Sequence, residues 1–276
     1  MEGRYLLGTT PLEQTLHTLR REYEVDISPE ELAERTTLAE AARRGRPGVG
    51  SLAGVRDVPE AWRAHVAAVA DRPLFQRLYR DQRWRFAAVP VGSLISVQAH
   101  LHYGHALRRA GTAASPADVL ELCLPVQPEP LECWGGISEG DPPSASFFTR
   151  DPNVQVTSVR METQPLAVTF TIGKTAVFLQ VARLDGRLYL KNGTHRAVGL
   201  AASGVDLLPC VLVDVEDVDG LPHLLPFKAL MGAFPPLVAD FLDPSLYVSH
   251  VWRDRVKFIR LAPEMFSSAL PDREEG

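Results

Sequence analysis

The residues from Asn192 to Arg196 combine several groups that bind phosphate. Asn192 and Gly193 end an apolar run, and this dipeptide readily adopts tight-turn geometry. If a helix begins directly after it, the backbone N–H groups, the Thr194 hydroxyl, the His195 imidazole and the Arg196 guanidinium meet at one place. The sequence therefore predicts a phosphate-binding turn made of Asn192, Gly193, Thr194, His195 and Arg196. The structural alternative is a hairpin end with a capping threonine and a surface arginine.

Asp214 is the carboxylate that stands out, because it interrupts the buried apolar run 210–215. Carboxylates at the end of a strand often hold Mg²⁺. We expect Asp214 to be a magnesium ligand or a general base, with His195 as the second candidate catalytic group. A solvated acidic turn ahead of Gly220 is the alternative.

Three histidines, His100, His102 and His105, define a different candidate site. Two histidines separated by one residue on a strand share a face, and a third could complete a zinc site. This spacing favours a metal-dependent hydrolase as an alternative function. The sequence places no carboxylate or cysteine beside these histidines.

Arginines alternate with aromatic residues from Arg77 to Phe86. Surfaces that bind single-stranded nucleic acid have this composition, as do helix ends whose aromatic residues enter the core. A non-catalytic nucleic-acid or protein-binding module that uses the arginine-rich N-terminal part is therefore a second alternative.

Composition limits these possibilities. The chain has 276 residues and a formal charge of −5, which does not indicate a nucleic-acid-binding protein. Residues 1–115 carry 16 basic residues against 13 acidic ones, whereas the rest has 13 against 21. Three cysteines without a C-x-x-C pair favour a reducing, cytoplasmic location. No apolar run has the length of a signal peptide or a membrane span.

The elements that must position these groups can be read from periodicity and end signals. Helices are predicted over 10–44, with a start at Ser28, and over 59–80, with a kink or break at Pro73. Further helices are expected at 115–124, 195–203, 224–232 and 235–242. Strands are expected at 84–90, 154–159, 167–172, 176–182, 188–190, 210–215 and 256–261. Asp185 and Gly186 predict a hairpin between two of these strands.

The run Asp185–Val215, DGRLYLKNGTHRAVGLAASGVDLLPCVLVDV, resembles the ParB/sulfiredoxin superfamily. It reproduces the order of that family: a strand, a glycine turn that ends in arginine, an alanine-rich helix and a buried strand. Residues 89–101, VPVGSLISVQAHL, look like the family's early strand and loop. The resemblance implies an α+β fold with a ParB/sulfiredoxin-like mixed β-sheet, surrounding helices and an N-terminal helical extension. We accordingly expect the extension at 1–50, up to a break at Gly45–Ser51, and the α+β domain with its C-terminal helices and strand at 51–276.

The resemblance also implies ATP or CTP, with Mg²⁺, as the ligand. Sulfiredoxins have their catalytic cysteine where this chain has Thr194, so sulfiredoxin chemistry is not expected. ParB proteins have glutamate there and arginine at His195, and Gln164-Pro165-Leu166 resembles their upstream nucleotide motif. Gln98 lies on the loop that faces the phosphate turn in the resembled fold. We expect the protein to bind a nucleoside triphosphate or another phosphorylated ligand, with NTP hydrolysis or phosphoryl transfer as the corresponding reactions.

Overall fold

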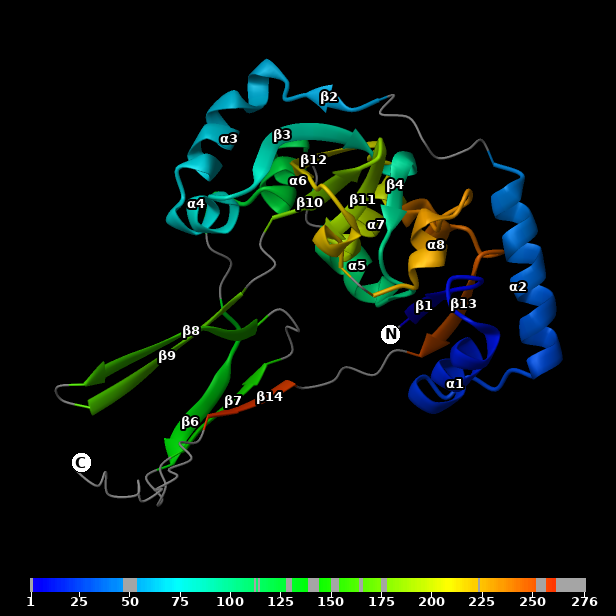
Figure 1. The fold of residues 1–276 in the computed structure, drawn as a ribbon, viewed down its shortest axis with the longest axis horizontal. Coiled ribbons are helices and arrows are strands. Elements are labelled where there is room, and N and C mark those ends of the chain that lie inside the picture. The colour runs from blue at the N-terminus through cyan, green and yellow to red at the C-terminus, as the bar shows by residue number, and fades with distance from the viewer. Residues whose placement is uncertain are drawn as a thin grey trace, which may run out of the picture. The chain divides into compact units, whose positions relative to one another are not determined.

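The computed structural model describes residues 2–46, 54–111, 113, 115–127, 131–138, 144–149, 154–163, 166–174, 178–222, 224–251 and 257–261. In this part of the chain the fold is α+β, with eight α-helices and four β-sheets (Figure 1). The chain forms two compact units. The first consists of 1–129 and 176–253, and the second of 130–175 and 254–276.

A six-stranded mixed sheet is the centre of the first unit. Its strands lie in the order β2 (Arg56–Asp57), β3 (Arg83–Pro90), β12 (Leu207–Asp214), β10 (Gln180–Leu184), β11 (Arg187–Asn192) and β4 (Leu94–Ser96). β12 runs parallel to β10, and β11 runs parallel to β4, whereas β10 and β11 are antiparallel. The parallel β4–β11 pair brings residues 94–96 beside 188–190, which lie almost a hundred positions later.

The predicted hairpin at Asp185 and Gly186 is confirmed. Both residues have positive φ, 48° and 75°, as the tight turns that suit twisted antiparallel strands require. In β11, Leu188 and Leu190 enter one hydrophobic core cluster and Tyr189 enters the other. Successive side chains of a strand point to opposite faces of the sheet, so the apolar residues of β11 are divided between the two cores.

The α-helices of the first unit surround these cores. They are α1 (Leu12–Glu22), α2 (Pro29–Arg44), α3 (Arg63–Ala70), α4 (Pro73–Tyr79), α5 (Tyr103–Ala110), α6 (Pro116–Cys123), α7 (Thr194–Ala202) and α8 (Phe227–Met231). Short 3-10 helices lie at η1 (Glu60–Trp62), η2 (Val91–Ser93), η3 (Val218–Gly220) and η4 (Val238–Leu242).

Several predicted helix ends are confirmed. The Ser28 hydroxyl accepts a hydrogen bond from the Glu31 N–H at 3.1 Å, which caps α2. Ser115 and Asp118 form a capping box on α6. The predicted helix 59–80 is divided, because Pro73 cannot continue α3 and instead begins α4.

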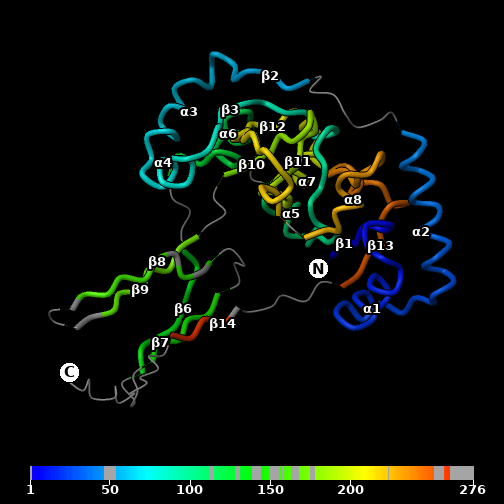
Figure 2. Tube along the Cα trace, viewed as in Figure 1, coloured from blue at the N-terminus to red at the C-terminus, as the bar shows by residue number. Residues whose placement is uncertain are grey.

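The N-terminal region contains the helices predicted within 10–44, as α1 and α2, together with a strand that was not predicted. Residues 2–6 form strand β1 (Glu2–Leu6), which lies between β13 (Tyr247–Val251) and β5 (His100–Leu101) in a second sheet. β1 and β13 come from distant parts of the chain and run antiparallel side by side (Figures 1 and 2). Local periodicity cannot reveal a strand whose partner lies some 245 positions away. The break predicted at Gly45–Ser51 falls mainly on residues 47–51, outside the described residues.

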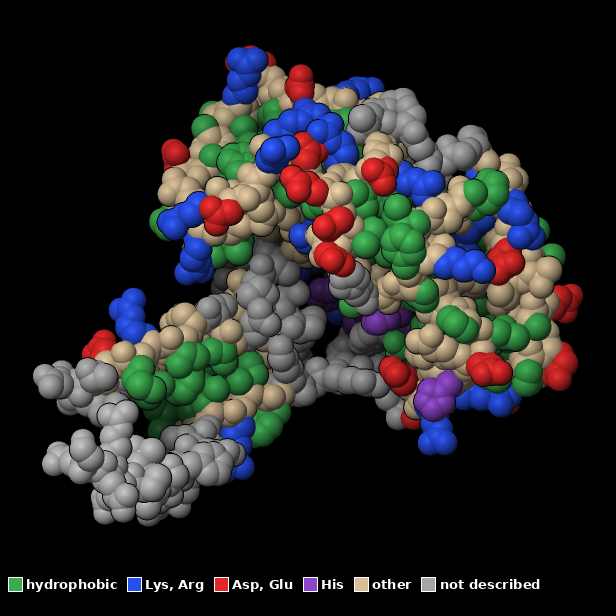
Figure 3. All heavy atoms as spheres, in the orientation of Figure 1, with side chains coloured by type: hydrophobic (Ala, Val, Ile, Leu, Met, Phe, Trp, Pro, Cys, Tyr) green, Lys and Arg blue, Asp and Glu red, His purple; other side chains and the backbone are tan. Residues whose placement is uncertain are grey.

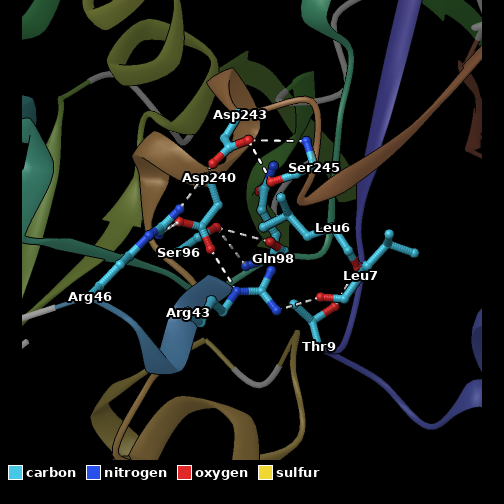
Figure 4. A network of polar contacts seen from close by, with 10 residues as sticks. All are labelled: Leu6, Leu7, Thr9, Arg43, Arg46, Ser96, Gln98, Asp240, Asp243 and Ser245. Carbon is cyan, nitrogen blue, oxygen red and sulfur yellow. Dashed lines mark hydrogen bonds and ion pairs between the residues drawn. The ribbon is translucent and has the colours of Figure 1, made fainter. Parts of the chain in front are cut away.

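A buried ion pair also joins the N-terminal helices to the rest of the first unit. Arg43 of α2 donates from Nε to Asp240 of η4 at 2.8 Å, and Asp240 is fully buried. Arg46 binds the other carboxylate oxygen, and Arg43 Nη1 donates to the Leu7 carbonyl at 2.6 Å (Figure 4). Because burial removes water from these charges, the loss of either partner would leave the other uncompensated. The N-terminal helices are thus part of the first unit.

The second unit is built from strands. β6 (Trp134–Ser138), β7 (Ser144–Thr149) and β14 (Lys257–Leu261) form a three-stranded sheet in the order β14-β7-β6. β8 (Val154–Thr163) and β9 (Leu166–Lys174) form a two-stranded antiparallel sheet. The strand predictions in this region are confirmed. No helix within the described residues has the length and apolar character needed to cross a membrane.

Candidate functional site

The predicted strand–turn–helix at residue 193 is present. β11 ends at Asn192, Gly193 adopts the left-handed conformation with φ of 97°, and α7 begins at Thr194. A Cβ atom on Gly193 would lie 3.1 Å from Leu179 Cγ and 3.2 Å from Arg196 Nη2. The backbone angle therefore favours glycine, and an added Cβ would also crowd the Leu179 and Arg196 side chains. The Asn192 side chain fixes the strand end by donating to the Phe178 carbonyl at 2.9 Å.

The first turn of α7 presents backbone donors. The first N–H groups of any helix have no partner within that helix, and in the described structure no side chain caps α7. The helical hydrogen bonds begin with the Ala197 N–H, which donates to the Gly193 carbonyl at 2.9 Å. The positive end of the helix dipole adds to the attraction of this turn for an anion.

Arg196 is buried, and its guanidinium lies beside Gly193, where an added Cβ would be 3.2 Å from Nη2. It is only 3% exposed, and its Nη1 donates to the Leu122 carbonyl in the last turn of α6 at 3.2 Å. Thr194 is also buried. The Arg196 guanidinium is therefore close to the turn but has little access to solvent. Arg196 also stabilises the negative end of α6.

His195 lies against the predicted histidine cluster. The centroids of the His105 and His195 rings are 5.3 Å apart, and those of His102 and His105 are 5.7 Å apart. Burial, together with the positive charges of His105, His102, Arg109 and His100, lowers the pKa of His195 to about 3. At neutral pH His195 is therefore uncharged, so it acts as a hydrogen-bonding group and not as a cation.

Gln98 follows β4 at the same end of the sheet as the turn. β4 runs parallel to β11, with Ser96 opposite Leu190. Gln98 comes two residues after Ser96 and Asn192 two residues after Leu190, so both lie toward the same end of the sheet. The Gln98 side-chain amide donates to the His100 carbonyl at 2.7 Å. This contact holds the loop that carries the histidines, so Gln98 supports the loop geometry.

Asp214 does not join the turn, which corrects its predicted role beside His195. It ends β12 opposite Arg183 of β10, whereas Gln180, at the other end of β10, lies opposite Asn192. Arg183 binds both carboxylate oxygens, from Nε at 2.5 Å and from Nη2 at 2.7 Å. Asp214 is thus an exposed carboxylate with an arginine partner, at the opposite end of the sheet from Gly193.

The histidine cluster does not have the arrangement of a metal site. Among the described residues, no three His, Cys, Asp or Glu side chains are placed to hold a metal ion. The His100 ring lies near Tyr23, with 6.3 Å between centroids, whereas His105 lies near His195. His102 and His105 lie together, but no third ligand joins them among the described residues, which argues against the alternative zinc site.

The aromatic residues of the 77–86 run pack with one another. The Phe75 ring lies 4.5 Å from Tyr79 and 4.7 Å from Trp84 between centroids. Arg85 pairs with Asp57 at 2.8 Å. The structural interpretation of this run, an aromatic core at a helix end with arginines around it, accounts for these contacts.

One basic residue near the turn was not predicted from the sequence. Arg109 of α5 is half-buried and acts electrostatically on His195. α5 packs closely on α7, because a Cβ on Gly199 would lie 2.2 Å from the Ala106 carbonyl oxygen. The sequence signal that could have pointed to Arg109 is the short helical segment directly after His102.

The resembled nucleotide motif at Gln164 and Pro165 lies outside the described residues.

Comparisons with protein-family models, curated proteins and solved structures gave no match to this chain.

Proposed function

We propose that this protein binds a nucleoside triphosphate or another phosphorylated ligand at the Gly193 end of β11. The observation that carries the proposal is the group of nitrogen side chains beside the start of α7. The centroids of the His195 and His105 rings are 5.3 Å apart, and those of His105 and His102 are 5.7 Å apart. Imidazole rings donate hydrogen bonds, and Arg109 of α5 adds a positive charge that acts on His195. The first N–H groups of α7 have no partner within the helix.

A phosphate group suits this arrangement for two reasons. Its oxygens accept hydrogen bonds from several N–H donors at once, and its negative charge is attracted by the Arg109 guanidinium and by the positive end of the α7 dipole. The left-handed Gly193 lets α7 begin directly at the end of β11, which brings the N–H groups of the turn together. ATP or CTP, with or without Mg²⁺, are the first ligands to test, because the resemblance at Asp185–Val215 suggests them.

The proposal is for binding and includes no hydrolysis step. The two residues predicted to be catalytic, His195 and Asp214, lie at opposite ends of the sheet. A pKa of about 3 also makes His195 a weak base at neutral pH. Asp214 is held by Arg183 and is not positioned to bring Mg²⁺ to the turn.

A thermal-shift panel of nucleotides and inorganic phosphate, each with and without Mg²⁺, tests the proposal. A ligand at about 100 times its Kd stabilises the folded protein by about 2.7 kcal/mol. We expect a shift with at least one nucleotide, and we expect His105→Ala to reduce it. His17→Ala, on the exposed face of α1, is the matched control and should keep the wild-type shift. The absence of a shift with every phosphate compound would refute the proposal.

A further inference from the structure

A second place in the first unit has the shape of a ligand site. A pocket of about 430 Å³ is formed by the loop between β1 and α1, the last turns of α2 and the segment that holds α8. Among the described residues, none that belongs to β11, α5 or α7 lines it. Its volume is in the range of pockets that hold small organic ligands. The phosphate site proposed at Gly193 therefore does not account for this pocket.

Basic side chains outnumber acidic ones in the pocket. Arg43, Arg44 and Lys228 line it, and Glu40 is the one acidic lining residue among those described. Figure 3 shows basic side chains on the surface between α2 and α8. Arg44 lies 3.7 Å from Glu40, and Arg43 pairs with Asp240 at 2.8 Å. Lys228 is exposed and has no ion-pair partner in the described part of the chain. The Lys228 charge is therefore the one that no carboxylate offsets.

The Arg43 guanidinium forms a fixed wall of the pocket. Its Nε donates to Asp240 and its Nη1 to the Leu7 carbonyl, as Figure 4 shows. Arg46 and Asp243 complete this network, so that two arginines face two carboxylates and their charges cancel. Arg43 Nη2 is buried and has no hydrogen-bond partner in the described structure. Because an unsatisfied buried N–H is costly, an acceptor bound against this wall is favourable.

The pocket also has an apolar part. Phe234 lines it and is 40% exposed, and Pro226 and Pro236 belong to the same lining. An apolar group packed on the Phe234 ring removes this surface from water, which stabilises the complex. The pocket thus suits a ligand with one charged end and an apolar body.

We propose that the pocket binds a small carboxylic acid, with its carboxylate toward Lys228 and Arg43 and its apolar body against Phe234. One positive charge without a partner suits a monoanion. A phosphate monoester carries a charge of about −1.5 to −2 at neutral pH, which Lys228 alone does not balance. This site is independent of the phosphate site proposed at the Gly193 end of β11.

Saturation-transfer NMR on the full-length protein tests the proposal with benzoate and hexanoate and with their uncharged amides, benzamide and hexanamide. We expect the wild type to bind the acids about fivefold more tightly than the amides, the upper end of what a partly exposed ion pair contributes. Lys228→Met should remove this preference, whereas Lys228→Arg should keep it. Equal binding of acids and amides by the wild type would overturn the proposal, and this comparison needs no variant to fold.

A pair of phenylalanine variants tests the apolar part of the pocket. Phe234→Ala should weaken the binding of both acids. Phe227→Ala is the matched control, because Phe227 is 59% exposed on α8 and is not among the described residues that line the pocket. Equal effects of the two substitutions would contradict the placement of the ligand.

Competition separates this site from the phosphate site. ATP should not displace benzoate, since the two ligands bind at different places. Displacement by ATP would put benzoate at the Gly193 end and overturn the proposal. Displacement of benzoate by phenyl phosphate at a lower concentration than by hexanoate would also overturn it, because the pocket would then prefer a dianion.

Discussion

The two ends of the central sheet differ in charge, burial and backbone geometry. At the Gly193 end, a left-handed turn opens α7, and His195 is surrounded by basic groups. At the Asp214 end, an exposed carboxylate is held by Arg183. The first arrangement has hydrogen-bond donors and one cation, Arg109, whereas the carboxylate of the second is already paired. The difference is the reason that we place the proposed anion site at the Gly193 end and interpret the other end as a surface ion pair.

The largest effect is expected from Gly199→Val, which separates α5 from α7. A Cβ at this position would lie 2.2 Å from the Ala106 carbonyl oxygen, and a backbone atom cannot easily move away. Forced overpacking costs about 3 kcal/mol, and it would displace His105 and Arg109 from His195. Urea denaturation should show the loss of stability, and nucleotide binding should be lost with it. Unchanged stability would mean that the two helices are not closely packed.

A pair of glycine variants tests the two ends of the central sheet directly. Gly193 and Gly186 both have positive φ, but a Cβ on Gly193 meets Leu179 and Arg196 whereas one on Gly186 meets nothing within 4 Å. We expect Gly186→Ala to cost about 1 kcal/mol of stability, from the left-handed backbone alone. Gly193→Ala should cost more and should also weaken ligand binding. If the two substitutions changed stability and ligand binding equally, the proposed difference between the two ends of the central sheet would be contradicted.

The pH dependence of stability tests the environment of His195. Its pKa is about 3 in the folded protein and about 6.5 in the unfolded chain. The unfolded chain therefore binds more protons between these values, so stability is complete above pH 6.5 and falls as the pH drops toward 3. The slope from one such group is at most about 1.4 kcal/mol per pH unit. His195→Asn should make the free energy of unfolding depend less steeply on pH. An unchanged dependence would show that His195 is not shielded from water.

Asp214→Asn should have the smallest effect. An exposed ion pair contributes less than about 1 kcal/mol, so the melting temperature should change little. Ligand binding should be the same as in the wild type, with or without Mg²⁺. A marked loss of Mg²⁺-dependent binding in this variant would move the site to the other end of the sheet.

Local signals predicted the parts of the fold that depend on nearby residues. Gly193 ends β11, Pro73 divides the helix before β3, and Asp185 and Gly186 close the hairpin, because each acts through its own backbone geometry. The long-range pairing of β1 with β13 was missed, since neither strand carries information about its partner. The helices predicted within 10–44 depend on local signals and are present as α1 and α2.

The candidate site was predicted in part. The turn and the histidine loop were both found in the sequence, but as separate candidates, and the contact between His105 and His195 depends on how α5 packs on α7. Asp214 was predicted to be catalytic together with His195 because it interrupts a buried apolar run at the end of a strand. The register of β10 with β11 and β12 shows that these positions lie at opposite ends of the sheet.

The most direct test of the central claim is a calorimetric titration of ATP and CTP, with and without Mg²⁺, against the wild type, Arg109→Ala and Asp214→Asn. A hydrogen bond to a charged group contributes about 1.5–3 kcal/mol, so Arg109→Ala should weaken binding at least about tenfold. Asp214→Asn should bind as the wild type does. Binding that survives Arg109→Ala but is lost in Asp214→Asn would contradict the assignment of the ligand to the Gly193 end.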